Sequence, residues 1–161
     1  METRTGFLIS QIKQRQGRVF QRLLQDCGVE EFNGPQGNIL YVLWQGDGVP
    51  IVELSRKTGL AKNTLTAMLG RMEESGLIYR RQSAEDHRKS FICLTEKARG
   101  LEDRYEQVSQ QMNELFFQGF RDSEIEELEG YLDRIVANLQ RAERAGKAFP
   151  QGVSPAETEK R

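Results

Sequence analysis

The hydrophobic pattern of the chain changes its period near residue 77, and this change limits the fold more than any other feature. Between residues 34 and 76, three short stretches place apolar side chains at helical spacing, and each stretch ends at a glycine. Residues 77–81 and 90–94 are instead short runs of aromatic and branched side chains, which are typical of strands. The polar residues 82–89 lie between them and predict a long hairpin tip. The sequence therefore predicts a mainly α-helical fold with a small β-hairpin.

Longer helical segments are predicted on both sides of this region. An N-terminal helix is expected over residues 7–25. Thr95 can cap a long helix that reaches residue 116. Another helix is expected to begin at Ser123, because Glu126 follows three residues later, as in a capping box. The two outermost helices carry apolar seams that a single chain has no obvious way to cover: Leu8, Ile12, Val19 and Leu23, and Ile125, Leu128, Leu132, Ile135 and Leu139.

Composition and charge exclude several classes of protein. The 161 residues include 23 Lys and Arg and 24 Asp and Glu, which rules out a polybasic, histone-like protein. The charge is nevertheless uneven, because residues 51–94 carry a net +3 and residues 95–145 a net −5. One histidine, His87, and two cysteines, Cys27 and Cys93, are too few for a zinc finger or another His/Cys metal site. We therefore expect neither a metal nor a cofactor.

Other features indicate a soluble, cytoplasmic protein that is not an enzyme. No apolar run approaches the roughly 20 residues of a membrane span, and the start of the chain lacks the apolar core of a signal peptide. The two cysteines lie far apart in a chain of this size, which favours a reducing compartment. There is no Ser/His/Asp set, phosphate loop or metal-ligand cluster, so we expect no catalytic activity.

The stretch from residue 62 to residue 75 has the two faces of a helix that reads DNA. Its buried face is expected to consist of Leu65, Met68, Leu69 and Met72. The outward face is a strip of small polar side chains with one arginine: Asn63, Thr64, Thr66, Ala67, Gly70 and Arg71. Lys62 directly precedes this strip and is expected to contact DNA with it. Short side chains let a helix approach the major groove, and Asn or Thr can bond to base edges. The alternative is an ordinary surface helix, which usually carries more Glu and Lys, whereas Glu73 and Glu74 lie only at the end here.

The hairpin tip is the second candidate contact with DNA. His87, Arg88 and Lys89 lie in this tip, and Arg88 is expected to enter the narrow, negative minor groove. Asp86 could hold the Arg88 guanidinium through a bidentate pair. The alternative is a solvated basic loop without a role in recognition. Together with the helix over residues 62–75, the tip predicts a winged helix-turn-helix.

Two motifs resemble those of the MarR family of transcriptional regulators. The family's helix-turn-helix is similar to the run Glu53-Leu54-Ser55, Gly59-Leu60, Asn63-Thr64-Leu65-Thr66, Leu69-Gly70-Arg71-Met72-Glu73 and Gly76-Leu77-Ile78. The family's D-x-R…L-T wing signature is similar to Asp86-His87-Arg88 followed by Leu94-Thr95. The resemblance covers roughly residues 7–145. It implies a cytoplasmic homodimer that binds pseudo-palindromic DNA, usually represses, and dimerises through helices from both termini.

The chain departs from the family pattern at two positions near the reading helix. Ala61 stands where a polar N-cap is common, and Ala67 stands where a basic residue is frequent, so one contact with a base or phosphate would be lost. Many members release DNA when a phenolic or other lipophilic anion binds between the dimer helices and the DNA-binding lobe. By this resemblance Arg18, Tyr41 and Trp44 could line the effector crevice, although Tyr and Trp on a helix are more often core residues.

The cysteines do not match the redox-sensing pattern of the family. Peroxide-sensing members use a cysteine near the start of the first helix. Cys27 follows that helix here and Cys93 lies on a predicted strand, so we expect buried structural thiols.

We therefore expect four segments along the chain. They are an N-terminal dimerisation helix (1–32), a winged helix-turn-helix lobe (33–95), C-terminal dimerisation helices (96–145) and a flexible tail (146–161). The expected function is that of a dimeric regulator that binds double-stranded DNA and is released by a small lipophilic or phenolic effector. By the resemblance to the family, the expected regulatory role is repression. The alternative is a winged-helix module for protein–protein interaction that does not bind DNA.

Overall fold

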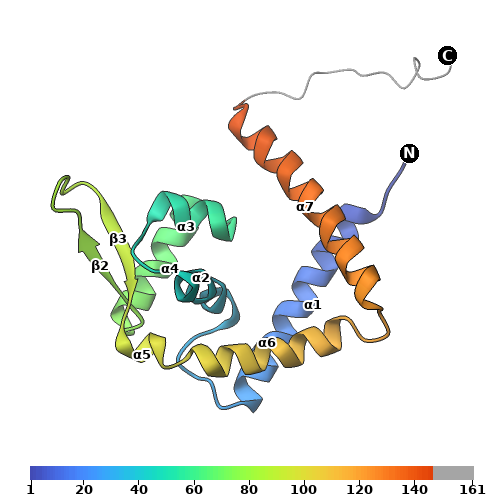
Figure 1. Cartoon of the computed structure of the whole chain (residues 1–161), viewed down its shortest axis with the longest axis horizontal. Coiled ribbons are helices and arrows are strands. Elements are labelled where there is room, and N and C mark those ends of the chain that lie inside the picture. The colour runs from blue at the N-terminus through green and yellow to red at the C-terminus, as the bar shows by residue number, and fades with distance from the viewer. Residues whose placement is uncertain (147–161) are drawn as a thin grey trace. The chain divides into compact units, whose positions relative to one another are not determined.

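The computed structural model describes residues 1–146 as two units, residues 1–116 and a second unit that begins at residue 117 (Figure 1). The helices of the first unit are α1 (Thr5–Asp26), α2 (Gly34–Gln45), α3 (Ile51–Thr58), α4 (Lys62–Glu74), α5 (Glu96–Arg99) and α6 (Glu102–Phe116). Its strands are β1 (Val49–Pro50), β2 (Ile78–Gln82) and β3 (Ser90–Leu94). The second unit contains α7 (Asp122–Arg144). The mainly helical fold is confirmed, whereas the predicted tail, apart from residue 146, lies outside the described residues.

The three strands form one antiparallel sheet in the order β1-β3-β2. Strands β2 and β3 pair Ile78 with Leu94 at one end and Gln82 with Ser90 below the loop, which confirms the predicted hairpin. The sequence does not predict β1, because two residues carry no periodicity. Pro50 ends β1 and precedes α3, where its fixed φ suits the extended backbone (φ −63°, ψ 149°).

The helix predicted from Thr95 to residue 116 is divided into α5 and α6. Thr95 does cap the first piece, because its Oγ1 accepts the N–H of Ala98 at 3.2 Å. The carbonyl of Ala98 then accepts the N–H of Leu101 at 3.1 Å and the indole N–H of Trp44 at 3.0 Å. These two bonds replace the next helical bond to that carbonyl, so the expectation of one uninterrupted helix is wrong.

Helix α7 begins at Asp122, and its first turn is capped by a different glutamate from the one expected. The backbone N–H of Arg121 donates to Glu124 Oε2 at 2.8 Å, and the Arg121 guanidinium donates to Oε1 at 3.1 Å. The predicted pair of Ser123 and Glu126 is therefore wrong, although the helix itself is present. The hydrogen bonds from Arg121 lower the pKa of Glu124 below its ordinary value.

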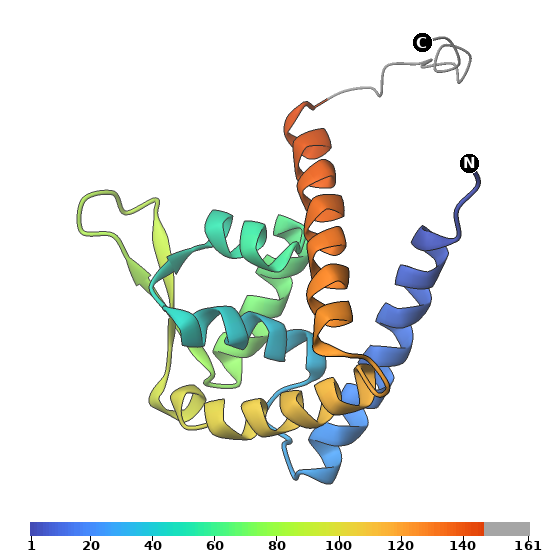
Figure 2. The ribbon, with the colours of Figure 1, turned by 45° about the vertical axis from the view of Figure 1, so that its right-hand side comes forward.

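The core of the first unit lies between its helices and one face of the sheet. Buried apolar side chains from α1 to β3 form it: Leu24, Ile39, Leu40, Leu43, Leu54, Leu65, Leu69, Met72, Leu77, Ile78 and Ile92. Helix α1 packs against α2 and α6, and α3 packs against α2 and α4. Figures 1 and 2 show the loop between β2 and β3 projecting away from these helices.

Tyr105 of α6 is the centre of an aromatic cluster. Its ring centroid lies 5.1 Å from that of Trp44, 5.8 Å from Phe20, 6.0 Å from Tyr41 and 6.1 Å from Phe32. Burial raises the pKa of Tyr105 above its ordinary value, so the phenol stays neutral at physiological pH. The cluster joins α1, α2 and α6 in one packed body.

Candidate functional site

The turn between α3 and α4 sets the direction of the candidate reading helix, α4. Gly59 ends α3 in the left-handed region at φ 72°, which glycine adopts without steric cost. The Ser55 hydroxyl donates to the carbonyl of Leu60 at 2.6 Å, and the Thr58 hydroxyl donates to the carbonyl of Leu54 at 2.7 Å. Side chains of α3 thus fix the conformation of the turn, and the turn sets the direction in which α4 begins.

Helix α4 has the two faces that the sequence predicts. Its apolar residues Leu65, Met68, Leu69 and Met72 are all buried. The expected contact residues are all exposed: Lys62, Asn63, Thr64, Thr66, Ala67 and Arg71. No acidic side chain lies among them, because Glu73 and Glu74 fall in the last turn. Their contact with DNA stays a prediction.

The first turn of α4 presents backbone donors without acceptors. Ala61 at the N-cap makes no side-chain cap, and the N–H of Leu65 is the first to reach a backbone acceptor, Ala61 O at 2.9 Å. The N–H groups of residues 62–64 have no acceptor in the described part of the chain, which suits an anion. The Thr66 hydroxyl donates to the Lys62 carbonyl at 2.8 Å, so its oxygen remains an acceptor.

The hairpin loop is closed by its own hydrogen bonds. The N–H of Ser83 donates to the carbonyl of Lys89, and the N–H of Lys89 donates to the carbonyl of Asp86, both at 2.9 Å. Asp86 Oδ1 accepts the backbone N–H of Arg88 at 3.0 Å and its Nε–H at 3.4 Å. The expected bidentate pair is wrong, because one carboxylate oxygen takes both donors. The Arg88 side chain is 93% exposed, and His87 and Lys89 are exposed beside it.

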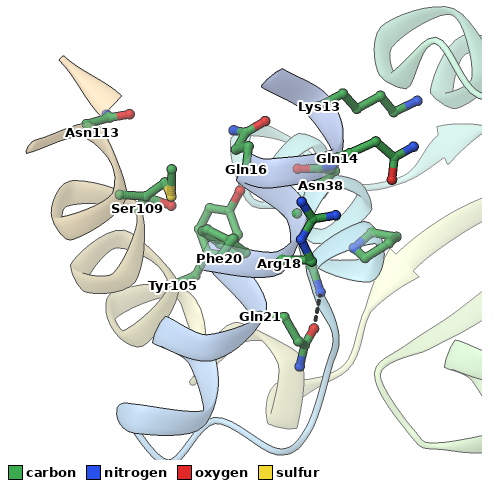
Figure 3. Close-up of a pocket in the computed structure, with 14 residues that line it drawn as sticks. Lys13, Gln14, Gln16, Arg18, Phe20, Gln21, Asn38, Tyr105, Ser109 and Asn113 are labelled. Carbon is green, nitrogen blue, oxygen red and sulfur yellow. Dashed lines mark hydrogen bonds between the residues drawn. The ribbon is translucent and has the colours of Figure 1, made fainter. Parts of the chain in front are cut away.

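A cleft of about 600 Å³ opens among α1, α2 and α6. Lys13, Arg18 and Phe20 line it from α1, and Tyr105 and Asn113 line it from α6 (Figure 3). No Asp or Glu lines this cleft, and neither Lys13 nor Arg18 forms an ion pair with any residue between 1 and 146. The cleft therefore combines unneutralised positive charge with aromatic walls.

The three residues predicted to contact an effector are not brought together. Arg18 lines the cleft, whereas Tyr41 lines a second cleft that shares Tyr105 with the first. Trp44 lines neither of these clefts, because it packs in the aromatic cluster and donates its indole N–H inward. Sequence reasoning missed Lys13 and Tyr105, since helical spacing marks Tyr105 only as part of an apolar face.

The remaining candidate residues add no second site. Both cysteines are free thiols, and Cys93 is buried as expected while Cys27 is only partly buried. Among residues 1–146, no three His, Cys, Asp or Glu side chains are grouped so that they could hold a metal ion. Within the same residues, none of the helices combines the length and the apolarity needed to cross a membrane.

The α3–turn–α4 unit followed by the hairpin defines a winged helix-turn-helix protein. The sequence profile of the MarR family matches residues 32–90. The organic hydroperoxide resistance transcriptional regulator of Bacillus subtilis is 31% identical over 104 residues, which cover 65% of this chain and 69% of that protein. The chain belongs to the MarR family.

Two further comparisons bear on the family and the fold. The HTH-type transcriptional regulator TtmR of Methylorubrum extorquens is 36% identical over 88 residues, which cover 55% of this chain and 44% of that relative's length. The crystal structure of an S. aureus MepR–DNA complex superposes with a TM-score of 0.74 at 21% identity, over 85% of this chain and 99% of its counterpart. This last likeness concerns the fold alone.

Proposed function

We propose that the protein is a cytoplasmic, homodimeric transcriptional repressor that binds a pseudo-palindromic operator in double-stranded DNA. One observation carries this proposal: the outer face of α4 presents short polar side chains and no carboxylate before its last turn. A carboxylate on that face would be repelled by the phosphates of a groove. The names of the relatives, which are transcriptional regulators, and the DNA complex among the similar structures support it.

In this proposal α4 lies in the major groove. The free N–H groups of residues 62–64 hold a phosphate, which sets the register of the helix. Asn63 and Thr66 then read base edges, since an amide and a hydroxyl oxygen can both pair there. Arg71, two turns further along and exposed, contacts the phosphate backbone. The small side chain of Ala67 allows the helix axis to come close to the bases.

The hairpin tip reaches the neighbouring minor groove in the same arrangement. Only Nε of the Arg88 guanidinium is engaged by Asp86, so both Nη groups remain free for DNA. His87 and Lys89 flank this arginine and add contacts to phosphates. Asp86 acts by holding the backbone and the Nε of Arg88 in place, not by touching DNA.

Dimerisation follows from apolar side chains that each unit leaves uncovered. On α1, Phe7 is 63% exposed and Ile12 is 45% exposed. On α7, Leu139 is 60% exposed and no residue is buried. Covering one such side chain fully contributes roughly 1.5–3 kcal/mol. A second copy of the chain would supply that cover. Half-sites one helical turn apart would require the two α4 helices of a twofold-symmetric pair to lie about 34–36 Å apart.

The effector in this proposal is a lipophilic or phenolic anion that occupies the cleft of α1, α2 and α6. Arg18 and Lys13 supply the charge for its anionic group, because neither is neutralised within the described residues. Phe20 and Tyr105 supply aromatic surface for a ring. Ligands of this kind are held by a few polar groups in a mostly apolar cleft. Binding there releases the operator.

The test is selection of binding sites by the full chain from random duplex DNA. We expect enrichment of an inverted repeat with half-sites about 10 base pairs apart, and light scattering at twice the 18.5 kDa chain mass. Failure to enrich any sequence, even at low salt, would refute the proposal. In that case the fold would serve as a protein-interaction module.

A further inference from the structure

The two arginines of β2 point to opposite faces of the sheet and have different partners. Ile78 and Arg80 share one face, and Ile78 is buried in the core next to α4. On that face Arg80 Nε lies 3.2 Å from Glu73 Oε2 of α4. Arg81 lies on the other face, where its guanidinium sits 5.5 Å from the ring centre of Phe91. The charge of Arg80 is therefore already engaged within the protein.

The Arg80–Glu73 pair bridges the two elements that the proposed function sends to DNA. Between them the chain makes a tight turn at Gly76, which adopts φ 76°. Beyond Arg80 the strand continues toward the tip, and each residue adds about 3.3 Å. A small rotation of β2 relative to α4 would therefore displace Arg88 by a larger distance, because Arg88 lies further along the hairpin. The Arg80–Glu73 pair therefore adds a side-chain link between α4 and β2 beyond the turn that joins them in the chain.

We propose that Arg80 and Glu73 are positioning residues, which hold the wing at the angle from α4 that lets Arg88 reach the minor groove. The inference rests on the proposed function and adds to it a device that couples the reading helix to the wing. The rival role for Arg80 is a direct contact with phosphate. That role would be opposed by Glu73, whose carboxylate competes with phosphate for the same guanidinium.

The two roles predict opposite signs for the substitution Glu73→Gln. If Arg80 contacts phosphate, removing the Glu73 carboxylate frees a cation and tightens binding. If the pair positions the wing, the same change weakens binding. Glu74 provides a matched control, because it is exposed in the same turn and has no ion pair or hydrogen bond with any residue in the described part of the chain.

The experiment measures operator binding by fluorescence anisotropy at one fixed salt concentration. The operator is the duplex selected by the wild-type chain. We expect Glu73→Gln to weaken binding about two- to fivefold, the range for an exposed ion pair, while Glu74→Gln leaves it unchanged or slightly tighter. In an Arg88→Ala background we expect Glu73→Gln to cost nothing further, since there is no wing contact left to position. Thermal unfolding checks that each variant folds.

The outcomes separate this inference from the function on which it rests. Equal effects of Glu73→Gln and Glu74→Gln, or tighter binding by Glu73→Gln, overturn the positioning role while leaving DNA binding intact. A full additional loss from Glu73→Gln in the Arg88→Ala background also overturns it, because the pair would then act elsewhere. Absence of DNA binding by the wild-type chain refutes the proposed function itself, and the positioning role with it.

Discussion

Substitution of Gly37 by alanine tests the packing of α2 against α6. A Cβ atom at this position would lie 2.9 Å from Tyr105 Cε2 and 3.2 Å from Phe32 Cε2. Tyr105 has little room to withdraw, because its ring also contacts Trp44 and Phe20. The new methyl group must therefore displace part of the aromatic cluster.

The expected loss of stability in Gly37→Ala follows from two opposing contributions. Overpacking of a core costs about 1–3 kcal/mol, and replacing a helical glycine by alanine gains roughly 1 kcal/mol. Gly17→Ala is the matched control, because Gly17 also lies inside a helix and its added Cβ would meet no atom within 4 Å. We expect the free energies of unfolding of the two variants to differ by about 1–3 kcal/mol, with Gly37→Ala the less stable.

The assay is urea unfolding monitored by circular dichroism, at one protein concentration because dimerisation adds to apparent stability. In a thermal melt of the same two variants, the midpoints should differ by about 2–4 °C for each kcal/mol in a chain of this size. If Gly37→Ala is as stable as Gly17→Ala, the close approach of Tyr105 to α2 is wrong, and the cleft described above loses one of its walls.

Three further predictions concern the binding sites. Asp86→Ala should weaken operator binding up to about fivefold, whereas Glu85→Ala, which removes the same charge from the same loop, should not; titrations in which Asp86→Ala binds more tightly would disprove its bracing role. Asn63→Ala should lower the free energy of specific binding by about 1–3 kcal/mol and leave non-specific binding nearly unchanged. Arg71→Ala should weaken both kinds of binding and reduce the slope of log affinity against log salt concentration by about 1. If the two variants behave identically, α4 is oriented differently on DNA. Arg18→Ala should abolish the release of operator by millimolar salicylate, used as a probe anion, and equal release from both proteins would exclude Arg18 from the effector site.

The elements that sequence reasoning identified are those specified by local patterns. The apolar residues of α4 recur at helical spacing, so both its buried face and its exposed strip could be read from Leu65 and its neighbours. The strands β2 and β3 follow from branched and aromatic runs on either side of a polar loop. In each case the periodicity lies within one segment, and no distant partner is needed to recognise it.

The features that sequence reasoning missed depend on contacts between distant segments. Strand β1 exists because Val49 pairs with Ile92, more than forty residues away. The division between α5 and α6 depends on the Trp44 indole bonding to Ala98, a contact across 54 positions. The cleft beside Tyr105 forms only when α1, α2 and α6 are packed together. No single-segment pattern carries this information.

The most direct test of DNA recognition by α4 and the wing is the ratio of two affinities. The full chain is titrated, at one fixed salt concentration, against its selected duplex and against a duplex of the same composition in scrambled order. A sequence-specific regulator should bind the first at least about 10³-fold more tightly, and most of that ratio should disappear in the Asn63→Ala, Thr66→Ala double variant. A wild-type ratio near one would contradict the account.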